Sequence, residues 1–111
     1  MNRSPIIVKQ GNRSKVLRES FITYVESRGR VQIIHTRDGA SRVMSKTMNE
    51  LEETLKGGFF RIHRCFLVNM DCIDIFERTQ VRLQDGSSLL MSKYKYRDFV
   101  NSYLKYMSEK P

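Results

Sequence analysis

Short runs of β-forming residues followed by Asp-Gly dipeptides recur along this chain, and they restrict its fold more than any other feature. Residues 31–36 form one such run and precede Asp38-Gly39, while residues 80–83 precede Asp85-Gly86 and another apolar run at 88–91. Asp-Gly between β-forming segments is a strong signal for a tight hairpin turn. Because tight turns join antiparallel neighbours, the sequence predicts a mainly β fold built from antiparallel hairpins.

Three further segments have the composition of strands. Residues 6–8 are an apolar run, residues 21–25 are rich in β-branched and aromatic side chains, and residues 73–76 form a third segment. We expect residues 73–76 to pair with residues 81–83, next to the second Asp-Gly turn. Most of the chain is therefore predicted to form short strands.

Two segments are predicted to be helices. Thr47 and Glu50 match a capping box at the start of an apolar pattern with helical spacing, and Gly57 suits the position after the helix end. Near the C-terminus, apolar residues repeat at intervals of three and four, which predicts an amphipathic helix whose aromatic stripe belongs to the core. The residues of this stripe are Tyr96, Phe99, Val100, Tyr103 and Met107.

Positive charge dominates the chain, which has a formal net charge of +8 and a pI near 9.8. Its 111 residues suit one domain spanning 1–111. A domain with this much positive charge is suited to bind nucleic acid, although charge alone also fits an acidic partner or a membrane surface. Residues 47–58 reverse the balance, so this stretch, including Glu52, is expected to be a solvated face away from any anionic ligand.

Other classes of protein find little support. No apolar run approaches the ~20 residues of a membrane span, and the N-terminus lacks the apolar core of a signal peptide. We therefore expect a cytoplasmic protein whose cysteines, Cys65 and Cys72, are reduced. Nucleophile elbows and phosphate-binding glycine loops are absent, which predicts no enzyme activity and no cofactor. The spacing of the cysteines, His35 and His63 matches no common zinc site, so no metal is expected.

Basic residues cluster in three loops that lie between predicted strands and helices. Each loop is flanked by elements that would fix its backbone, and together they favour a DNA-binding function over three unrelated exposed charges. The cations are Arg28 and Arg30 in the first loop, His63 and Arg64 in the second, and Lys93 and Lys95 in the third.

The second loop lies in the most distinctive segment of the chain, FFRIHRCFLVN at residues 59–69. Its apolar residues would hold Arg64 at a strand end, where a planar guanidinium suits a phosphate or a guanine edge. The segment resembles F-x-R-I-H-R-S-F-L-V-N, the signature of the LytTR family, which is the DNA-binding domain of LytR/AgrA-type bacterial response regulators. Residues 24–30, 49–52 and 84–93 resemble further family motifs in the family's order, although Cys65 replaces the usual serine.

The resemblance covers about residues 6–104 and implies an elongated set of antiparallel β-sheets with short helices. In the family, loops at sheet ends enter successive major grooves on one face of duplex DNA, and by position these are the three basic loops above. Asn69 is expected to form a turn rather than to contact bases. Family members usually carry an N-terminal receiver domain, which this chain is too short to hold. The chain is thus either an excised output domain or a free-standing transcriptional regulator, and promoter repeats would allow a homodimer on DNA.

Two readings from other classes stay open. A β-rich module for RNA or single strands would need exposed aromatic side chains on a sheet face, whereas most Phe and Tyr here occupy core-like positions. A protein-interaction domain would dock a partner through its last helix and would not need arginines clustered in loops. The sequence favours duplex DNA over both.

Overall fold

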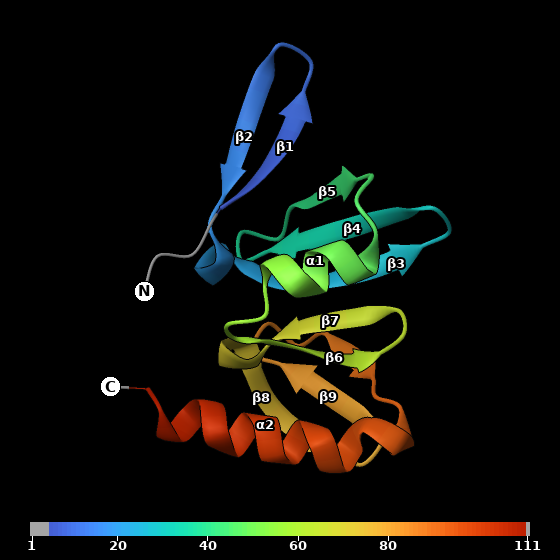
Figure 1. Ribbon diagram of the computed structural model, residues 1–111, viewed down its shortest axis with the longest axis vertical. Helices are drawn as coiled ribbons and strands as arrows, with labels where there is room; N and C mark the ends of the chain where they lie inside the picture. The colour runs from blue at the N-terminus through green and yellow to red at the C-terminus, as the bar shows by residue number, and fades with distance from the viewer. Residues whose placement is uncertain (1–4, 111) are drawn as a thin grey trace.

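The computed structural model describes residues 5–110, which fold into three antiparallel β-sheets with two α-helices (Figure 1). The molecule is elongated, with principal extents of 43 × 33 × 25 Å. The mainly β fold that the sequence predicts is therefore confirmed. The elements are β1 (Ile6–Gln10), β2 (Arg13–Leu17), η1 (Glu19–Phe21), β3 (Ile22–Arg28), β4 (Val31–Thr36), β5 (Ser41–Met44), α1 (Met48–Thr54), β6 (Phe59–His63), β7 (Phe66–Asn69), η2 (Met70–Cys72), β8 (Ile73–Glu77), β9 (Gln80–Leu83), β10 (Ser88–Leu90), η3 (Lys93–Lys95) and α2 (Tyr96–Ser108), where η marks a 3-10 helix.

The central sheet has five strands in the order β5-β4-β3-β7-β6. It consists of the hairpins β3–β4 and β6–β7, extended by β5 and joined where Val25 of β3 lies opposite Leu67 of β7. Just beyond that pair, the backbone N–H of Ser27 donates to the carbonyl of Cys65 at 2.9 Å. The β3–β4 turn and the β6–β7 turn therefore lie side by side at the same end of the sheet.

Alternate residues of this sheet face two different cores. Leu67 packs in a cluster with Val25 and the apolar residues of α1, whereas its neighbour Val68 packs in a second cluster with Phe99 of α2. This alternation is the two-residue period of a β-strand with both faces covered. The sheet is thus a rigid layer, buried on one side by α1 and on the other by α2 and the three-stranded sheet.

The three-stranded sheet has the order β10-β9-β8, and Phe76 lies opposite Val81 in it. This register confirms the predicted pairing of residues 73–76 with residues 81–83. The aromatic stripe of α2 covers the sheet: the Phe99 ring meets Phe76 edge-on at 5.2 Å and Phe60 at 5.6 Å between centroids. The prediction that this stripe belongs to the core is confirmed for Tyr96, Phe99, Val100 and Tyr103, whereas Met107 is exposed.

Both Asp-Gly dipeptides make the same turn. Asp38 Oδ1 accepts the backbone N–H of Ala40 at 3.1 Å, and Asp85 Oδ1 accepts that of Ser87 at 2.8 Å. The glycines that follow the two aspartates have φ of +84° and +94°, a region that side chains with a Cβ rarely adopt. The two predicted hairpins are confirmed, and their aspartates and glycines are explained by the turns.

The β1–β2 hairpin extends away from the rest of the molecule at the top of Figure 1. The sequence predicts a strand at residues 6–8, which the structure confirms and extends to Gln10. It does not predict β2, because four of the five β2 residues are exposed and three of these are Arg13, Ser14 and Lys15. With apolar positions that few, the strand has no readable alternation.

Helix α1 begins as the sequence predicts. Thr47 Oγ1 accepts the Glu50 N–H at 3.1 Å, and Glu50 Oε1 accepts the Thr47 N–H at 3.0 Å, which is a complete capping box. The expected position of Gly57 after the helix end is wrong. The helix is capped at Leu55, and Gly57 does not have a positive φ, so its lack of a side chain is not used for that purpose.

Candidate nucleic-acid interface

The three basic segments lie along one side of the molecule, at the right of Figure 1. The Ser27–Cys65 bond joins the β3–β4 turn to the β6–β7 turn, and the Ser92 N–H donates to the carbonyl of Ile62 at 2.8 Å, which joins the start of η3 to β6. Residues that are 38 and 30 positions apart in the sequence are thus connected through the backbone. The structure brings all three predicted segments together.

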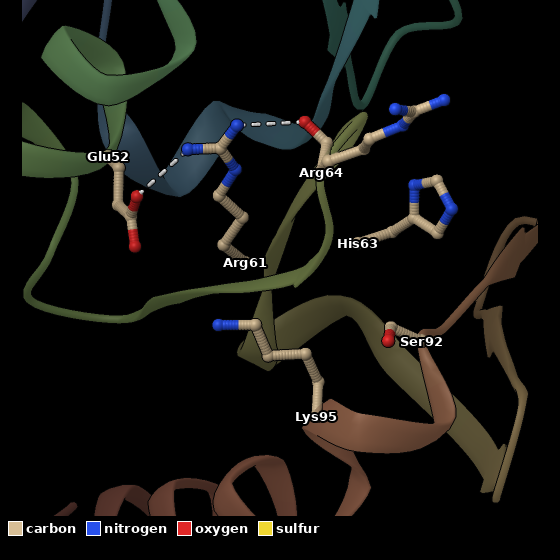
Figure 2. Close-up of a pocket in the computed structure, with 6 residues that line it drawn as sticks. All are labelled: Glu52, Arg61, His63, Arg64, Ser92 and Lys95. Carbon is tan, nitrogen blue, oxygen red and sulfur yellow. Dashed lines mark hydrogen bonds and ion pairs between the residues drawn. The ribbon is translucent and has the colours of Figure 1, made fainter.

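An open depression of about 420 Å³ lies between the second and third segments (Figure 2). Of the predicted site residues, it contains His63, Arg64 and Lys95, while Arg28, Arg30 and Lys93 do not line it. Its other members, Glu52, Arg61 and Ser92, were not predicted from the sequence as site residues. The complete lining is Glu52, Arg61, His63, Arg64, Ser92 and Lys95.

Arg61 holds the β6–β7 turn in place. Its Nη2 donates to the carbonyl oxygen of Arg64 at 2.9 Å, and its Nη1 donates to Glu52 Oε1 at 3.3 Å (Figure 2). Nη1 also donates to Asn49 Oδ1 at 2.5 Å. Its side chain is only 22% exposed. This guanidinium is therefore committed to linking α1 with the turn. A β-bulge lies between Arg61 and His63, so strand alternation gives no signal for this role, and the partners Asn49 and Glu52 lie twelve and nine residues away.

The position of Glu52 corrects an expectation. The sequence places the acidic residues of 47–58 on a solvated face away from any anionic ligand, but Glu52 lies in the depression and forms an ion pair with Arg61. Its carboxylate compensates Arg61, the arginine of the depression whose guanidinium is used inside the protein. The remaining cations of the depression, Arg64 and Lys95, keep their charges available for an anionic ligand.

Arg64 combines a fixed backbone with a free side chain. Its carbonyl is held by Arg61, and the next residue, Cys65, is bonded through its carbonyl to Ser27. Within residues 5–110, its guanidinium has no hydrogen-bond or ion-pair partner, and Figure 2 shows it extending away from Arg61. Buried Ile62 and Leu67 anchor the strands on either side of the turn. Such a group can bind a ligand with little loss of backbone freedom.

His63 presents one defined ring nitrogen to the depression. Its Nδ1 accepts the backbone N–H of Cys65 at 3.0 Å, so the proton of the neutral ring is on Nε2. The ring is flanked by Phe66, with centroids 5.7 Å apart. In this tautomer, His63 acts as a hydrogen-bond donor and suits acceptor atoms such as phosphate oxygens or guanine N7.

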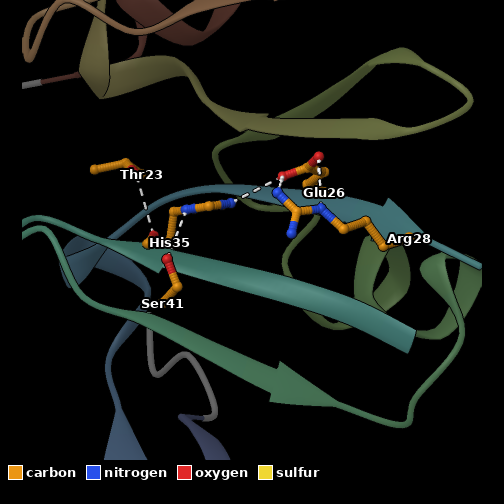
Figure 3. A network of polar contacts seen from close by, with 5 residues as sticks. All are labelled: Thr23, Glu26, Arg28, His35 and Ser41. Carbon is orange, nitrogen blue, oxygen red and sulfur yellow. Dashed lines mark hydrogen bonds and ion pairs between the residues drawn. The ribbon is translucent and has the colours of Figure 1, made fainter.

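Arg28 differs from Arg64 because it is paired (Figure 3). Its Nε donates to Glu26 Oε2 at 3.2 Å, and the same carboxylate accepts a hydrogen bond of 3.1 Å from His35 Nε2. Burial raises the pKa of Glu26, but the hydrogen bonds from Arg28 and His35 outweigh this effect and leave its pKa below the ordinary value. The Arg28 side chain is 65% exposed, yet its charge already has a partner on its own strand.

Arg30 remains the free cation of the β3–β4 turn. It is exposed and, within the part of the chain that the structure describes, has no ion pair. Gly29 before it has a φ of +59°, which the tight turn requires. Of the two arginines predicted for this loop, the structure thus leaves Arg30 available and commits Arg28 to Glu26.

The third segment is a 3-10 helix rather than the expected open loop. Ser92 caps it, since its Oγ accepts the Tyr94 N–H at 3.3 Å and its carbonyl accepts the Lys95 N–H at 2.9 Å. Lys95 lines the depression, and Lys93 Nζ lies 5.2 Å from the centroid of the Tyr94 ring. Both lysines are exposed.

The structure also shows the surroundings of Asn69 and of the two cysteines. Asn69 is buried, donates from Nδ2 to the Ile22 carbonyl at 2.8 Å and accepts the Asp71 N–H at 2.9 Å, which confirms its predicted role in a turn. Cys65 and Cys72 are free thiols, and burial raises the pKa of Cys72. Residues 5–110 contain no group of three or more His, Cys, Asp or Glu side chains arranged to hold a metal. The same residues include no helix that meets the length and apolarity of a membrane span.

Comparisons with known proteins agree with this architecture. The family model described as the LytTr DNA-binding domain matches residues 12–103. The fold is similar to the solved LytTr DNA-binding domain of a methyl-accepting/DNA response regulator from Bacillus cereus, with a TM-score of 0.76 and 20% identity over 93% of this chain and 98% of that one. A comparison with curated protein sequences gave no significant match. The match over residues 12–103 shows that this chain belongs to the LytTR family of DNA-binding domains, which serves transcription regulation and is not an enzyme family.

Proposed function

We propose that this chain binds double-stranded DNA at specific sequences and reads successive major grooves through its three basic segments. The observation that carries the proposal is the free guanidinium of Arg64 on a backbone fixed by Arg61 and by the bond from Ser27 to Cys65. The guanidinium has five N–H donors in a planar fork, and on this fixed backbone it matches the O6 and N7 acceptors of guanine. Arg30, Lys93 and Lys95 then contact phosphates on either side.

The arrangement of the segments supports binding along one face of the duplex. The β3–β4 turn, the β6–β7 turn and η3 follow one another down the long axis of the molecule (Figure 1). Equivalent grooves on one face of B-DNA recur about every 10 bp. We therefore propose two major-groove contacts about one helical turn apart.

The single-strand alternative lacks its main requirement. A stacking platform needs several exposed aromatic rings, but among the Phe and Tyr side chains of residues 5–110 only Tyr94 is exposed. We also propose that residues 1–111 are one LytTR-type domain with its core at about 6–104. A receiver domain elsewhere and a homodimer on promoter repeats are further parts of this proposal.

Binding selection from random duplex DNA, followed by hydroxyl-radical footprinting, tests the proposal. We expect protection that recurs at ~10 bp on one face of the duplex. With about six phosphate contacts, log K should fall against log salt with a slope near −5. Preference for single strands, a flat salt profile or one continuous protected block on both faces would contradict the proposal.

A further inference from the structure

Tyr94 is the one aromatic side chain of residues 5–110 that is exposed, and its exposed fraction is 82%. The other phenylalanines and tyrosines are buried or half-buried in the two cores. Removing an aromatic ring from water is favourable, so a ring that projects this far has much to gain from a contact. Nothing within the described chain provides that contact beyond the ammonium of Lys93.

The backbone of Tyr94 is fixed although its ring is free. Its N–H is bonded to Ser92 Oγ, and Ser92 is itself bonded to Ile62, one residue before His63 in β6. The ring therefore projects from a short, capped helix that is joined to the strand carrying the base-reading candidates. Its exposure is a property of an ordered segment.

The neighbours of Tyr94 indicate what its ring would meet. Residues of a 3-10 helix are about 120° apart around its axis, so Lys93 and Lys95 extend to either side of the ring. Two lysines that reach phosphates on the two sides would direct the ring between two backbones, into a groove. In the major groove, the C5-methyl of thymine is the apolar group on the base edges.

We propose that Tyr94 determines specificity by packing its ring against a thymine C5-methyl in the major groove, with Lys93 and Lys95 on the neighbouring phosphates. This inference rests on the duplex binding proposed above and adds an apolar contact to the polar ones at His63 and Arg64. The ring cannot stack on the base faces of a duplex, because these faces are already stacked on one another. It therefore contacts a base edge.

Replacing thymine by deoxyuridine tests the contact, because this change removes only the methyl group. Each thymine of the selected operator is replaced in turn, and the affinity of the wild-type protein is measured. We expect one position where deoxyuridine weakens binding about fourfold, which corresponds to one buried methyl group. Tyr94→Ala should bind both forms of that operator equally, while Tyr94→Phe should still distinguish them.

Leu104→Ala is the matched control, because Leu104 is 59% exposed on α2 and lies eight residues beyond Tyr96, about 12 Å along the helix. It should distinguish the two operators as the wild type does. The inference is overturned if no thymine shows an effect, if Tyr94→Ala still senses the methyl group, or if it weakens all sequences alike. Failure of the wild type to bind duplex DNA would instead overturn the proposed function.

A fluorescent variant gives an independent readout. The chain has no tryptophan, so Tyr94→Trp introduces a single reporter at an exposed position that needs no repacking. We expect its emission to shift and to be quenched on saturation with the operator, with a smaller change on a scrambled duplex. Emission that is unchanged while the protein binds would contradict a ring contact with DNA.

Discussion

The two turns at one end of the central sheet are both basic, but Arg28 beside the first turn and Arg64 in the second are in opposite states. In the β3–β4 turn, Arg28 is paired with Glu26, which also binds His35. In the β6–β7 turn, the acidic partner goes to Arg61 instead, and Arg64 has no partner in the described chain. A cation at a turn is therefore available to a ligand only when no acidic side chain of the fold forms an ion pair with it.

Arg64 should show the largest effect on this comparison. We expect Arg64→Ala to weaken specific binding by about 1–3 kcal/mol and to relax the preference at one base position. Arg64→Lys keeps the charge and loses the planar fork, so it should behave like Arg64→Ala on the operator and like wild type on a scrambled duplex. Titrations on both duplexes measure this difference. Wild-type behaviour of Arg64→Lys on both would make Arg64 a phosphate contact and His63 the better base-reading candidate.

Arg61 should be the residue that makes the second turn different. Arg61→Met keeps the apolar stem and removes the donors to Asn49, Glu52 and the Arg64 carbonyl. We expect it to lower the free energy of unfolding by about 1–2 kcal/mol, since hydrogen bonds of a charged donor are lost. Urea denaturation measures this, and operator binding of the folded variant should lose the base preference that Arg64 provides. Unchanged stability would show that Arg61 does not hold the turn.

Lys95 should act through charge alone. Lys95→Ala is expected to weaken binding to operator and scrambled duplex by the same factor and to reduce the salt slope by about one unit. Lys56 provides the control. It pairs with Glu53 and does not line the depression, so Lys56→Ala should leave the salt slope unchanged. A base-dependent effect of Lys95→Ala would move Lys95 to the base-reading group.

Arg28 should show a small effect that depends on Glu26. Because the Arg28 side chain is 65% exposed, Arg28→Ala should change stability by less than about 0.5 kcal/mol. It should also change DNA binding little in the wild type. In a Glu26→Gln background Arg28 loses its ionic partner, so the same change should now reduce the salt slope. The full double-mutant cycle measures this coupling, and equal effects in both backgrounds would remove the proposed difference between the turns.

The smallest expected effect is the pH dependence of the Glu26 pair. The pKa of Glu26 is lowered in the folded protein, so its contribution to stability is present above its ordinary value of 4.5 and is lost as pH falls through the folded pKa. The difference in unfolding free energy between wild type and Glu26→Gln should therefore be largest near neutral pH. This difference should shrink below about pH 4.5. Denaturant titrations near neutral pH and below pH 4.5 measure it.

Local signals in the sequence determined most of the secondary structure. The Asp-Gly hairpins, the capping box at Thr47 and the aromatic stripe of α2 are each encoded within a few neighbouring residues, and each was found in place. Strand β2 and the end of α1 were missed, because exposed polar residues carry no alternation and a glycine near a helix end need not cap it. The three basic segments named from the sequence lie along one side of the structure, and their role in DNA binding stays a prediction.

Tertiary structure alone decided which basic residues are available. Arg61 meets Asn49 twelve residues earlier in the chain, and His35 meets Glu26 across two paired strands, so both partnerships depend on sheet order and register. A list of cations contains no such information, which is why Arg28 and Arg64 look alike in sequence. The physical reason is that the partners which pair with an arginine come from distant parts of the chain and meet it only after folding.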